Sequence, residues 1–283
     1  MKIHKGIRRI VPSAARLTYN PVFKAVVDSF DVVPRYLYRE FSNIPPNHLR
    51  IRVGAAPGLA KGILANQAYY LTVARDFWMH AFHAELCRLD STIVDIGCGC
   101  GRYAHHLRDY RFKSEKFSGK YIGIDIDSEM LNWCRGHFDP ERFQFFQSTH
   151  ASKVYLNSES GEDSYALPIA DSVADLVFST SVFTHLLEEQ LIEYCRESHR
   201  VLKPGAHMAM YCFCLDYPPP TFGDRHTFSH KIGNASVESI AFPEAAVAYT
   251  KEFLFSVARE TGFQKTEMLT CQNDLQPLLL CQK

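Results

Sequence analysis

The sequence has no excess of charge of either sign. Lysine and arginine together number 31 among its 283 residues, and aspartate and glutamate together also number 31. A protein whose main partner is a nucleic-acid backbone usually carries a basic excess. The balance therefore argues against a nucleic acid and favours a small or neutral partner.

Long apolar runs are missing as well. The sequence contains no run of about eighteen consecutive apolar residues, which a membrane-spanning helix would need. The first 27 residues are lopsided in charge, because they carry basic side chains and no acid. Pro12 and Pro21 interrupt this segment, and it lacks the apolar core and cleavage site of a secretory signal. We predict a solvated arm, with contact to a membrane surface as the alternative.

The nine cysteines lack the pattern of a disulfide framework or of a metal site. Their number is odd, and several lie in apolar runs such as residues 208–214. Zinc sites usually separate paired cysteines by two or more residues and need a second such pair, whereas this chain has only the Cys-x-Cys pairs 98/100 and 212/214. We expect reduced thiols, no metal and a cytoplasmic location.

The hydrophobic content supports one good-sized core. At 46% hydrophobic and 22% charged residues, the chain can bury an α/β core and leave a short extra segment. We expect an N-terminal extension over residues 1–60, built from short helices separated by proline and glycine turns, and one domain over residues 61–283. Apolar spacing predicts a helix between Asn66 and Arg88.

Strand-like runs alternate with helical runs in the rest of the chain. Strands are predicted at 92–96, 120–125, 143–147, 174–179 and 206–213, and helices at 102–108, 128–137, 188–200 and 244–261. Such alternation indicates a parallel sheet with helices on both faces. Two further strand-like segments, 263–269 and 275–281, predict a terminal hairpin.

The first predicted strand runs into three glycines, in the motif Asp95-Ile96-Gly97-Cys98-Gly99-Cys100-Gly101. An open parallel sheet binds its ligand at the carboxyl ends of the strands, and the first strand-to-helix turn is the usual floor of that crevice. Glycine permits φ > 0 and lets a ligand lie against the backbone. A dinucleotide fingerprint would need its third glycine where Arg102 stands, which disfavours a nicotinamide enzyme.

A carboxylate follows the second predicted strand, in the segment Gly123-Ile124-Asp125-Ile126-Asp127. An acid at this position can accept hydrogen bonds from both hydroxyls of a ribose. We favour Asp125 for that role, and we interpret Asp127 as the cap of the next helix.

Together these motifs resemble the class I S-adenosylmethionine-dependent methyltransferases. The glycine loop resembles motif I of that family, residues 167–179 resemble its LPF-x-D-x-x-FD-x-V-x-S signature, and residues 200–206 resemble its R-V-L-K-P-G-G turn. The run Ser181-Val182-Phe183-Thr184-His185-Leu186 is similar to a motif of the methyltransferase type 11/25 subgroup.

The resemblance implies a Rossmann-like, seven-stranded, mostly parallel sheet with a terminal antiparallel hairpin and helices on both faces. It also implies S-adenosyl-L-methionine as cofactor and S-adenosyl-L-homocysteine as product. The implied cofactor-binding residues are Asp95, Gly97, Cys98, Gly99, Gly101, Asp125, Ile126, Leu167 and Ser179.

Several residues are candidates for the chemistry itself. An imidazole just past the fourth strand titrates near neutrality, so His185 is a candidate general base; the alternative is that it packs at the start of the next helix. His226 and His230 lie in the polar insert 216–243, where either could reach the substrate. Tyr155 and Tyr165, in the insert 148–165, are candidates for the pocket wall.

The resemblance leads to a prediction of function. We expect methyl transfer from S-adenosylmethionine to an oxygen or nitrogen of a small-molecule acceptor such as a sugar or secondary metabolite, with the N-terminal extension acting as a lid. The alternatives are a protein or RNA methyltransferase and a non-catalytic S-adenosylmethionine-binding module.

Overall fold

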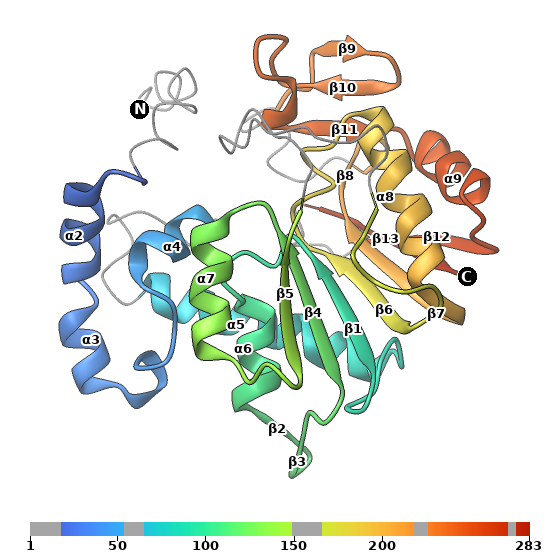
Figure 1. Ribbon diagram of the computed structural model, residues 1–283. Helices are drawn as coiled ribbons and strands as arrows, with labels where there is room; N and C mark the ends of the chain where they lie inside the picture. The colour runs from blue at the N-terminus through green and yellow to red at the C-terminus, as the bar shows by residue number, and fades with distance from the viewer. Residues whose placement is uncertain (1–17, 54–64, 149–165, 218–225, 271–275) are drawn as a thin grey trace.

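A computed structural model describes residues 18–53, 65–148, 166–217, 226–270 and 276–283 (Figure 1). Its centre is a seven-stranded sheet in the order β12-β13-β7-β6-β1-β4-β5. The strands are β1 (Thr92–Ile96), β4 (Lys120–Asp125), β5 (Phe143–Gln147), β6 (Ala174–Ser179), β7 (Leu202–Tyr211), β12 (Lys265–Leu269) and β13 (Leu278–Gln282). The neighbours from β7 to β5 run parallel, whereas β13 pairs antiparallel with both β7 and β12. The predicted fold class is therefore confirmed.

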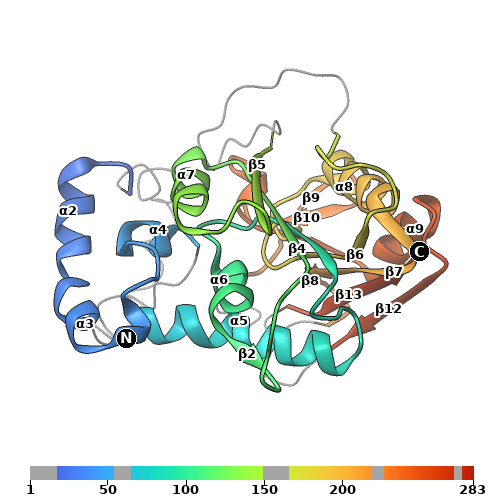
Figure 2. The same cartoon turned by 60° about the horizontal axis from the view of Figure 1, so that its bottom comes forward.

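Helices cover both faces of this sheet (Figure 2). Residues of α5 (Ala65–His83), α6 (Arg102–Asp109) and α7 (Ser128–His137) pack in one apolar cluster, and residues of α8 (Glu188–Val201) and α9 (Lys251–Glu260) pack in another. Successive residues of a strand point to opposite faces. In β1, Ile93 accordingly joins the first cluster and Val94 the second. The sheet is buried on both sides, which leaves the strand ends as the place for a site.

The N-terminal helices form a separate layer beside α7 (Figure 1). They are α2 (Pro21–Ser29), α3 (Val32–Leu37), the 3-10 turn η2 (Arg39–Phe41) and α4 (Asn47–Arg52). A buried ion pair between Arg50 and Asp31, with 2.6 Å between Nη2 and Oδ1, ties this layer together. Gln67 of α5 donates to the same carboxylate oxygen at 2.9 Å. The short helices expected in this part of the chain are present between residues 18 and 53.

The segment between β7 and α9 corrects one prediction. It contributes to a second, four-stranded sheet in the order β8-β11-β10-β9, made of β8 (Phe213–Cys214), β11 (Val247–Tyr249), β10 (Ala235–Val237) and β9 (His230–Ile232). The helix predicted over 244–261 was wrong at its start, because the 3-10 turn η4 (Pro243–Ala245) and β11 precede it. The strand β11 is fully buried, and it pairs with β10 on one side and β8 on the other. The helix α9 begins at Lys251, after Thr250 accepts a hydrogen bond from the Phe253 N–H as its cap.

Other element boundaries also differ from prediction. The helix α5 ends at His83, earlier than expected. The strand β7 begins at Leu202 instead of residue 206, directly after α8. Its pairing with β6 shifts register between Ala174 and Leu176, which places Pro204 and Gly205 in an irregular part of the strand. The loop after α6 contains a small hairpin of β2 (Arg111–Phe112) and β3 (Glu115–Lys116).

The eight cysteines in the described part of the chain are free and buried. None of the helices in those residues has the length and apolar character that crossing a membrane requires.

Candidate functional site

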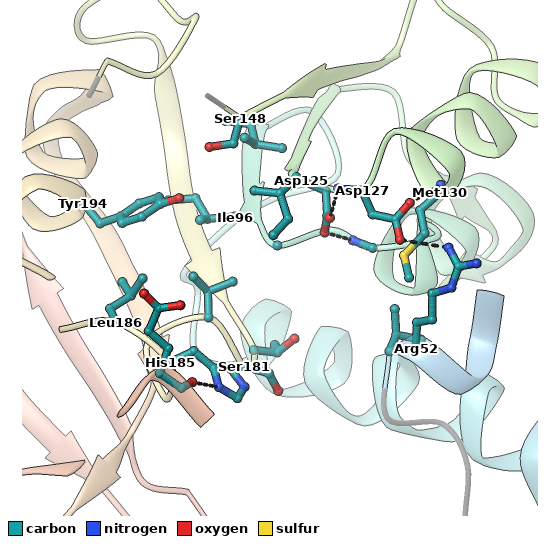
Figure 3. A pocket seen from close by; sticks show the side chains of 18 of the residues that line it. Arg52, Ile96, Asp125, Asp127, Met130, Ser148, Ser181, His185, Leu186 and Tyr194 are labelled. Atoms are coloured by element: carbon teal, nitrogen blue, oxygen red, sulfur yellow. Dashed lines mark hydrogen bonds and ion pairs between the residues drawn. The ribbon is translucent and has the colours of Figure 1, made fainter. Parts of the chain in front are cut away.

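A cavity of about 320 Å³ lies at the carboxyl ends of β1, β4 and β6. The end of α4 and the start of α7 form one side, and the segment after β6 forms the other together with α8 (Figure 3). The described residues that line it are Arg52, Val53, Ile96, Gly97, Gly99, Arg102, Ile124, Asp125, Ile126, Asp127, Met130, Ser148, Thr180, Ser181, Val182, His185, Leu186, Gln190, Tyr194 and Glu244. The structure thus brings Gly97, Gly99, Asp125, Ile126 and His185 to one cavity.

The glycine loop requires glycine for two physical reasons. Gly97 and Gly99 have φ values of 80° and 54°, in the left-handed region that other residues rarely adopt. A Cβ on Gly97 would lie 2.2 Å from Cγ2 of Val182, and one on Gly99 would lie 2.4 Å from Cγ1 of Val53. The missing side chains therefore let the walls of the cavity close against the loop backbone.

Asp125 reaches the cavity from the end of β4. One carboxylate oxygen accepts a hydrogen bond from the Gly99 N–H at 2.7 Å, and the other accepts one from the Asp127 N–H at 2.9 Å. Burial raises the pKa of the Asp125 carboxyl to about 6, and these backbone donors act in the opposite direction. The carboxylate is held in one orientation and keeps lone pairs for further donors.

Asp127 caps α7, as its position in the sequence indicates. Its Oδ1 accepts the N–H groups of Glu129 and Met130 at 3.0 and 3.2 Å. Its Oδ2 accepts a hydrogen bond from Arg52 Nη1 at 2.9 Å and one from the hydroxyl of Tyr19, also at 2.9 Å. Asp127 therefore joins the site to the N-terminal helices.

Asp95 lies beneath the loop instead of on the cavity wall. Its side chain is fully buried, and one oxygen accepts a hydrogen bond from the Tyr121 hydroxyl. The other oxygen, Oδ1, has no hydrogen-bond partner among the described residues. Burial raises the pKa of the Asp95 carboxyl to about 7, although the bond from Tyr121 opposes this shift.

Four other residues implied by the resemblance are also absent from the described lining of the cavity. The Cys98 side chain is buried in the α5–α7 cluster. Gly101 faces Phe138 and Cys134, 3.0 to 3.1 Å from where its Cβ would be. The N–H of Leu167 donates to Glu197 Oε2 at 2.7 Å on the α8 side of the sheet, and Ser179 is buried at the end of β6.

His185 follows β6 and contributes its ring to the cavity (Figure 3). Its Nδ1 lies 2.7 Å from the carbonyl oxygen of Glu244. A carbonyl only accepts, so Nδ1 carries the hydrogen and Nε2 has the lone pair in the neutral ring. Burial lowers the pKa of His185 below its ordinary value, while the contact with Glu244 opposes the shift. The ring is therefore neutral at neutral pH.

The remaining candidates lie elsewhere. His226 stacks on Phe228, and His230 is exposed in β9; neither belongs to the described cavity lining. Tyr155 and Tyr165 fall outside the described residues.

Sequence reasoning missed several residues of the cavity wall. Arg52 and Val53 come from the N-terminal extension, and Glu244 comes from η4. Gln190 and Tyr194 share one face of α8 because they are four residues apart. That spacing was a usable signal, but which face meets the cavity depends on how α8 packs.

The comparisons with known proteins agree with this architecture. The family model described as a methyltransferase domain matches residues 94–210. A curated relative, methyltransferase AacuQ of Aspergillus aculeatus, is 30% identical over 159 residues, which are 56% of this chain and 44% of that protein. The match therefore spans less than half the length of that relative.

One solved structure shares the fold, and a second is similar over a smaller part of this chain. The S-adenosylmethionine-dependent methyltransferase SibL, in its apo form, is 16% identical with a TM-score of 0.50, over 83% of this chain and 62% of that chain. A SAM-dependent methyltransferase from Methanosarcina mazei is 20% identical with a TM-score of 0.48, over 71% of this chain and 96% of that chain. Over residues 94–210 the chain is similar to the methyltransferase domain family, and its fold is that of an S-adenosylmethionine-dependent methyltransferase.

The cavity suits the cofactor of this family. A ligand with ribose hydroxyls needs a fixed acceptor, and the half-buried Asp125 carboxylate is oriented by two backbone N–H groups. A ligand that lies on the backbone needs a loop without side chains, and Gly97 and Gly99 line the cavity. The residues present therefore fit S-adenosyl-L-methionine.

Proposed function

We propose that this protein transfers a methyl group from S-adenosylmethionine to an oxygen or nitrogen of a small-molecule acceptor. One observation carries the proposal: the glycine loop and Asp125 share a single cavity with His185. This arrangement sets a cofactor-holding group and a base within the same cavity.

We assign cofactor binding to Gly97, Gly99, Asp125 and Ile126. S-adenosylmethionine supplies an electrophilic methyl group on its sulfonium when bound. The Asp125 carboxylate accepts hydrogen bonds from the ribose hydroxyls, and the two glycines allow the cofactor to approach the backbone closely. For Asp95, Cys98, Gly101, Leu167 and Ser179 we propose an indirect role, in which they support the loop and the strands around it.

We assign the general base to His185. Its Nδ1–H is held by the Glu244 carbonyl, which orients the ring so that the lone pair on Nε2 accepts a proton from the acceptor. The lowered pKa keeps the ring neutral and ready to accept that proton. The deprotonated acceptor atom would be the nucleophile for the methyl group that bound S-adenosylmethionine supplies, with S-adenosylhomocysteine as the leaving group.

The size of the cavity supports a small acceptor. Pockets for small ligands typically enclose roughly 300–1,000 Å³, and about 320 Å³ lies at the low end of that range. Gln190, Tyr194 and Glu244 bring polar groups to the side where His185 lies. These groups suit an acceptor with its own hydrogen-bonding functions.

We further propose the division into an extension over residues 1–60 and a methyltransferase domain over 61–283, with the extension acting as a lid. Arg52 and Val53, at the end of α4, line the cavity. A wall built from the extension would exclude water from the reacting atoms.

Two measurements test the proposal. Calorimetry with S-adenosyl-L-homocysteine should give a dissociation constant in the micromolar range, and no binding would contradict the cofactor assignment. Radiolabelled S-adenosylmethionine, incubated with the protein and a cell extract, should transfer label to the small-molecule fraction. Label in the protein or RNA fraction would contradict the acceptor class, and binding without any transfer would favour a non-catalytic module.

A further inference from the structure

The charged side chains of α2 and α3 all face the protein. Lys24 and Asp28 are four residues apart and share one face of α2. Asp31, the N-cap residue of α3, lies four residues before Arg35 of that helix. Lys24 pairs with Glu129 at 2.6 Å, and Asp28 pairs with His48 at 2.7 Å. Asp31 pairs with Arg50, and Arg35 donates to the Ile44 carbonyl at 2.9 Å.

The opposite face of the same two helices is apolar and exposed. Val26, Val33 and Tyr36 are 52%, 63% and 90% exposed. Eight of the large hydrophobic side chains exposed within the described residues fall in this short segment, and we call them the outer face: Val22, Val26, Phe30, Val32, Val33, Tyr36, Leu37 and Tyr38. Between Pro21 and Tyr38 every charged side chain is at least partly buried.

This pattern reverses that of an ordinary surface helix. A surface helix buries its apolar stripe and turns its charges to water. Here the charges stabilise the contact with α4 and α7. The helices α2 and α3 lie at the edge of the molecule (Figure 1), and the apolar side chains named above are exposed there. A contiguous exposed apolar surface marks an interaction site.

We propose that the outer face docks on a membrane surface that contains anionic lipids. The nine-residue α2 is far shorter than the roughly 20 residues that spanning requires, so it would lie in the interface plane. Tyr36 and Tyr38 suit that depth, because tyrosine is enriched where headgroups meet water.

Charge decides in favour of anionic lipid over a second copy of the chain. The 17 residues before Thr18 carry Lys2, Lys5, Arg8, Arg9 and Arg16 and no acid. Only Thr18, Tyr19 and Asn20 separate these residues from α2, so a short stretch of chain links their positive charge to the helix that begins the outer face. Two copies packed through this face would bring two such segments together and repel. Binding to an anionic membrane is instead strengthened by about 1 kcal/mol for each Lys or Arg close to the membrane surface.

Docking through the outer face does not depend on methyl transfer. Lys24 and Arg52 both pair with Glu129 of α7, with N–O distances of 2.6 and 2.7 Å. These ion pairs connect α2, which carries part of the outer face, and α4 to α7, the helix that borders the cavity. A docked protein would therefore hold its site close to the lipid surface.

Vesicle sedimentation tests the proposal with the full chain. The protein should pellet with phosphatidylcholine vesicles that contain about 30% phosphatidylglycerol. Its affinity for vesicles of phosphatidylcholine alone should be roughly tenfold lower. Binding should also weaken at about 0.5 M salt, because salt screens the charge. Val26→Glu combined with Val33→Glu should reduce binding at least about tenfold.

Control variants separate apolar contact from added charge. Met79→Glu combined with Ile240→Glu adds the same two charges at exposed apolar positions elsewhere and should bind like wild type. Val26→Ser combined with Val33→Ser removes apolar surface without charge and should bind about fivefold more weakly. Circular dichroism checks that every variant is folded.

Three results would overturn the proposal: no binding to anionic vesicles, equal binding by wild type and the outer-face variants, or a dimer in sedimentation equilibrium that the Val26→Glu, Val33→Glu variant dissociates. The last result would assign the outer face to contact between copies of the chain.

Discussion

The guanidinium of Arg52 lies 2.9 Å from the carboxylate of Asp127, and both side chains are less than 10% exposed. This ion pair joins the N-terminal extension to the residue that caps α7. The backbone N–H of Asp127 in turn donates to Asp125, the proposed ribose acceptor. Asp127 therefore couples the extension to the proposed ribose acceptor.

Arg52→Gln should weaken both the fold and the site. Removing one partner of a buried ion pair leaves an uncompensated charge, which costs roughly 3 kcal/mol of the free energy of unfolding. Affinity for S-adenosylhomocysteine should fall as well, because Asp127 loses the group that holds it. Arg75→Gln removes an exposed pair with Asp76 and should change stability by less than about 0.5 kcal/mol. If chemical denaturation gave the same loss of stability for Arg52→Gln and Arg75→Gln, the coupling would be contradicted.

Asp125→Asn should reduce affinity for S-adenosylhomocysteine by about ten- to a hundredfold, since hydrogen bonds to a charged acceptor are worth roughly 1.5–3 kcal/mol. The pKa of about 6 adds a pH dependence. Wild-type affinity should fall as the pH drops through about 6, because the protonated carboxyl is a poorer acceptor. The variant should lack this dependence in calorimetric titrations. An unchanged dissociation constant would refute the ribose role.

His185→Asn separates orientation from proton transfer. The asparagine amide keeps a donor for the Glu244 carbonyl but has no counterpart of the imidazole Nε2. Turnover should fall by about 10²- to 10⁴-fold, which is the usual contribution of a general base. Binding of S-adenosylhomocysteine should stay within about twofold of wild type, because Asp125 and the glycine loop are unchanged. Full turnover in this variant would remove His185 from the mechanism.

Gly99→Ala and Gly136→Ala form a matched pair. An alanine at 99 would combine φ of 54° with a Cβ 2.4 Å from Val53, so we expect a loss of roughly 1–3 kcal/mol in stability and weaker cofactor binding. Gly136 lies in α7, and no heavy atom lies within 4 Å of the place that an alanine Cβ would take there. Alanine at 136 should therefore stabilise by about 0.5–1 kcal/mol. Thermal unfolding with and without S-adenosylhomocysteine measures both effects.

Asp95→Asn should change the pH dependence of stability. The folded state raises the Asp95 pKa from 3.8 to about 7, so the native protein holds a proton that the unfolded chain has released. The protonated Asp95 carboxyl therefore stabilises the wild-type fold at pH values below its pKa of 3.8 in the unfolded chain. This stabilisation is lost as the pH rises towards 7. The free energy of unfolding of Asp95→Asn, relative to that of wild type, should therefore rise by about 1 kcal/mol or more between the two pKa values. Above pH 7 the difference should stay constant.

Tyr121→Phe provides an independent check on the same carboxyl. It removes a donor that favours the ionised form, so the pH window of the stability loss should move upward. Urea denaturation at several pH values would measure both variants. Parallel curves for Asp95→Asn and wild type would contradict the assignment.

Local pattern was sufficient for most of the central sheet. The strands at 92–96, 120–125, 143–147 and 174–179 are as predicted, because each is a short apolar run bounded by polar residues or glycine. The segment Val247–Tyr249 was mistaken for helix, because three residues between two turns carry too little periodicity to show a strand. Its conformation depends on β8 and β10, which flank it in space.

The same division holds for the site. The sequence by itself determined the glycine loop, the acid after β4 and the histidine after β6, because those positions follow from chain order in a parallel sheet. Only the tertiary structure decided that Asp95 turns into the core, that Arg52 reaches Asp127, and that the apolar side of α2 and α3 faces outward. Each of these depends on which face of an element meets its neighbour, and side-chain burial, not local propensity, selects that face.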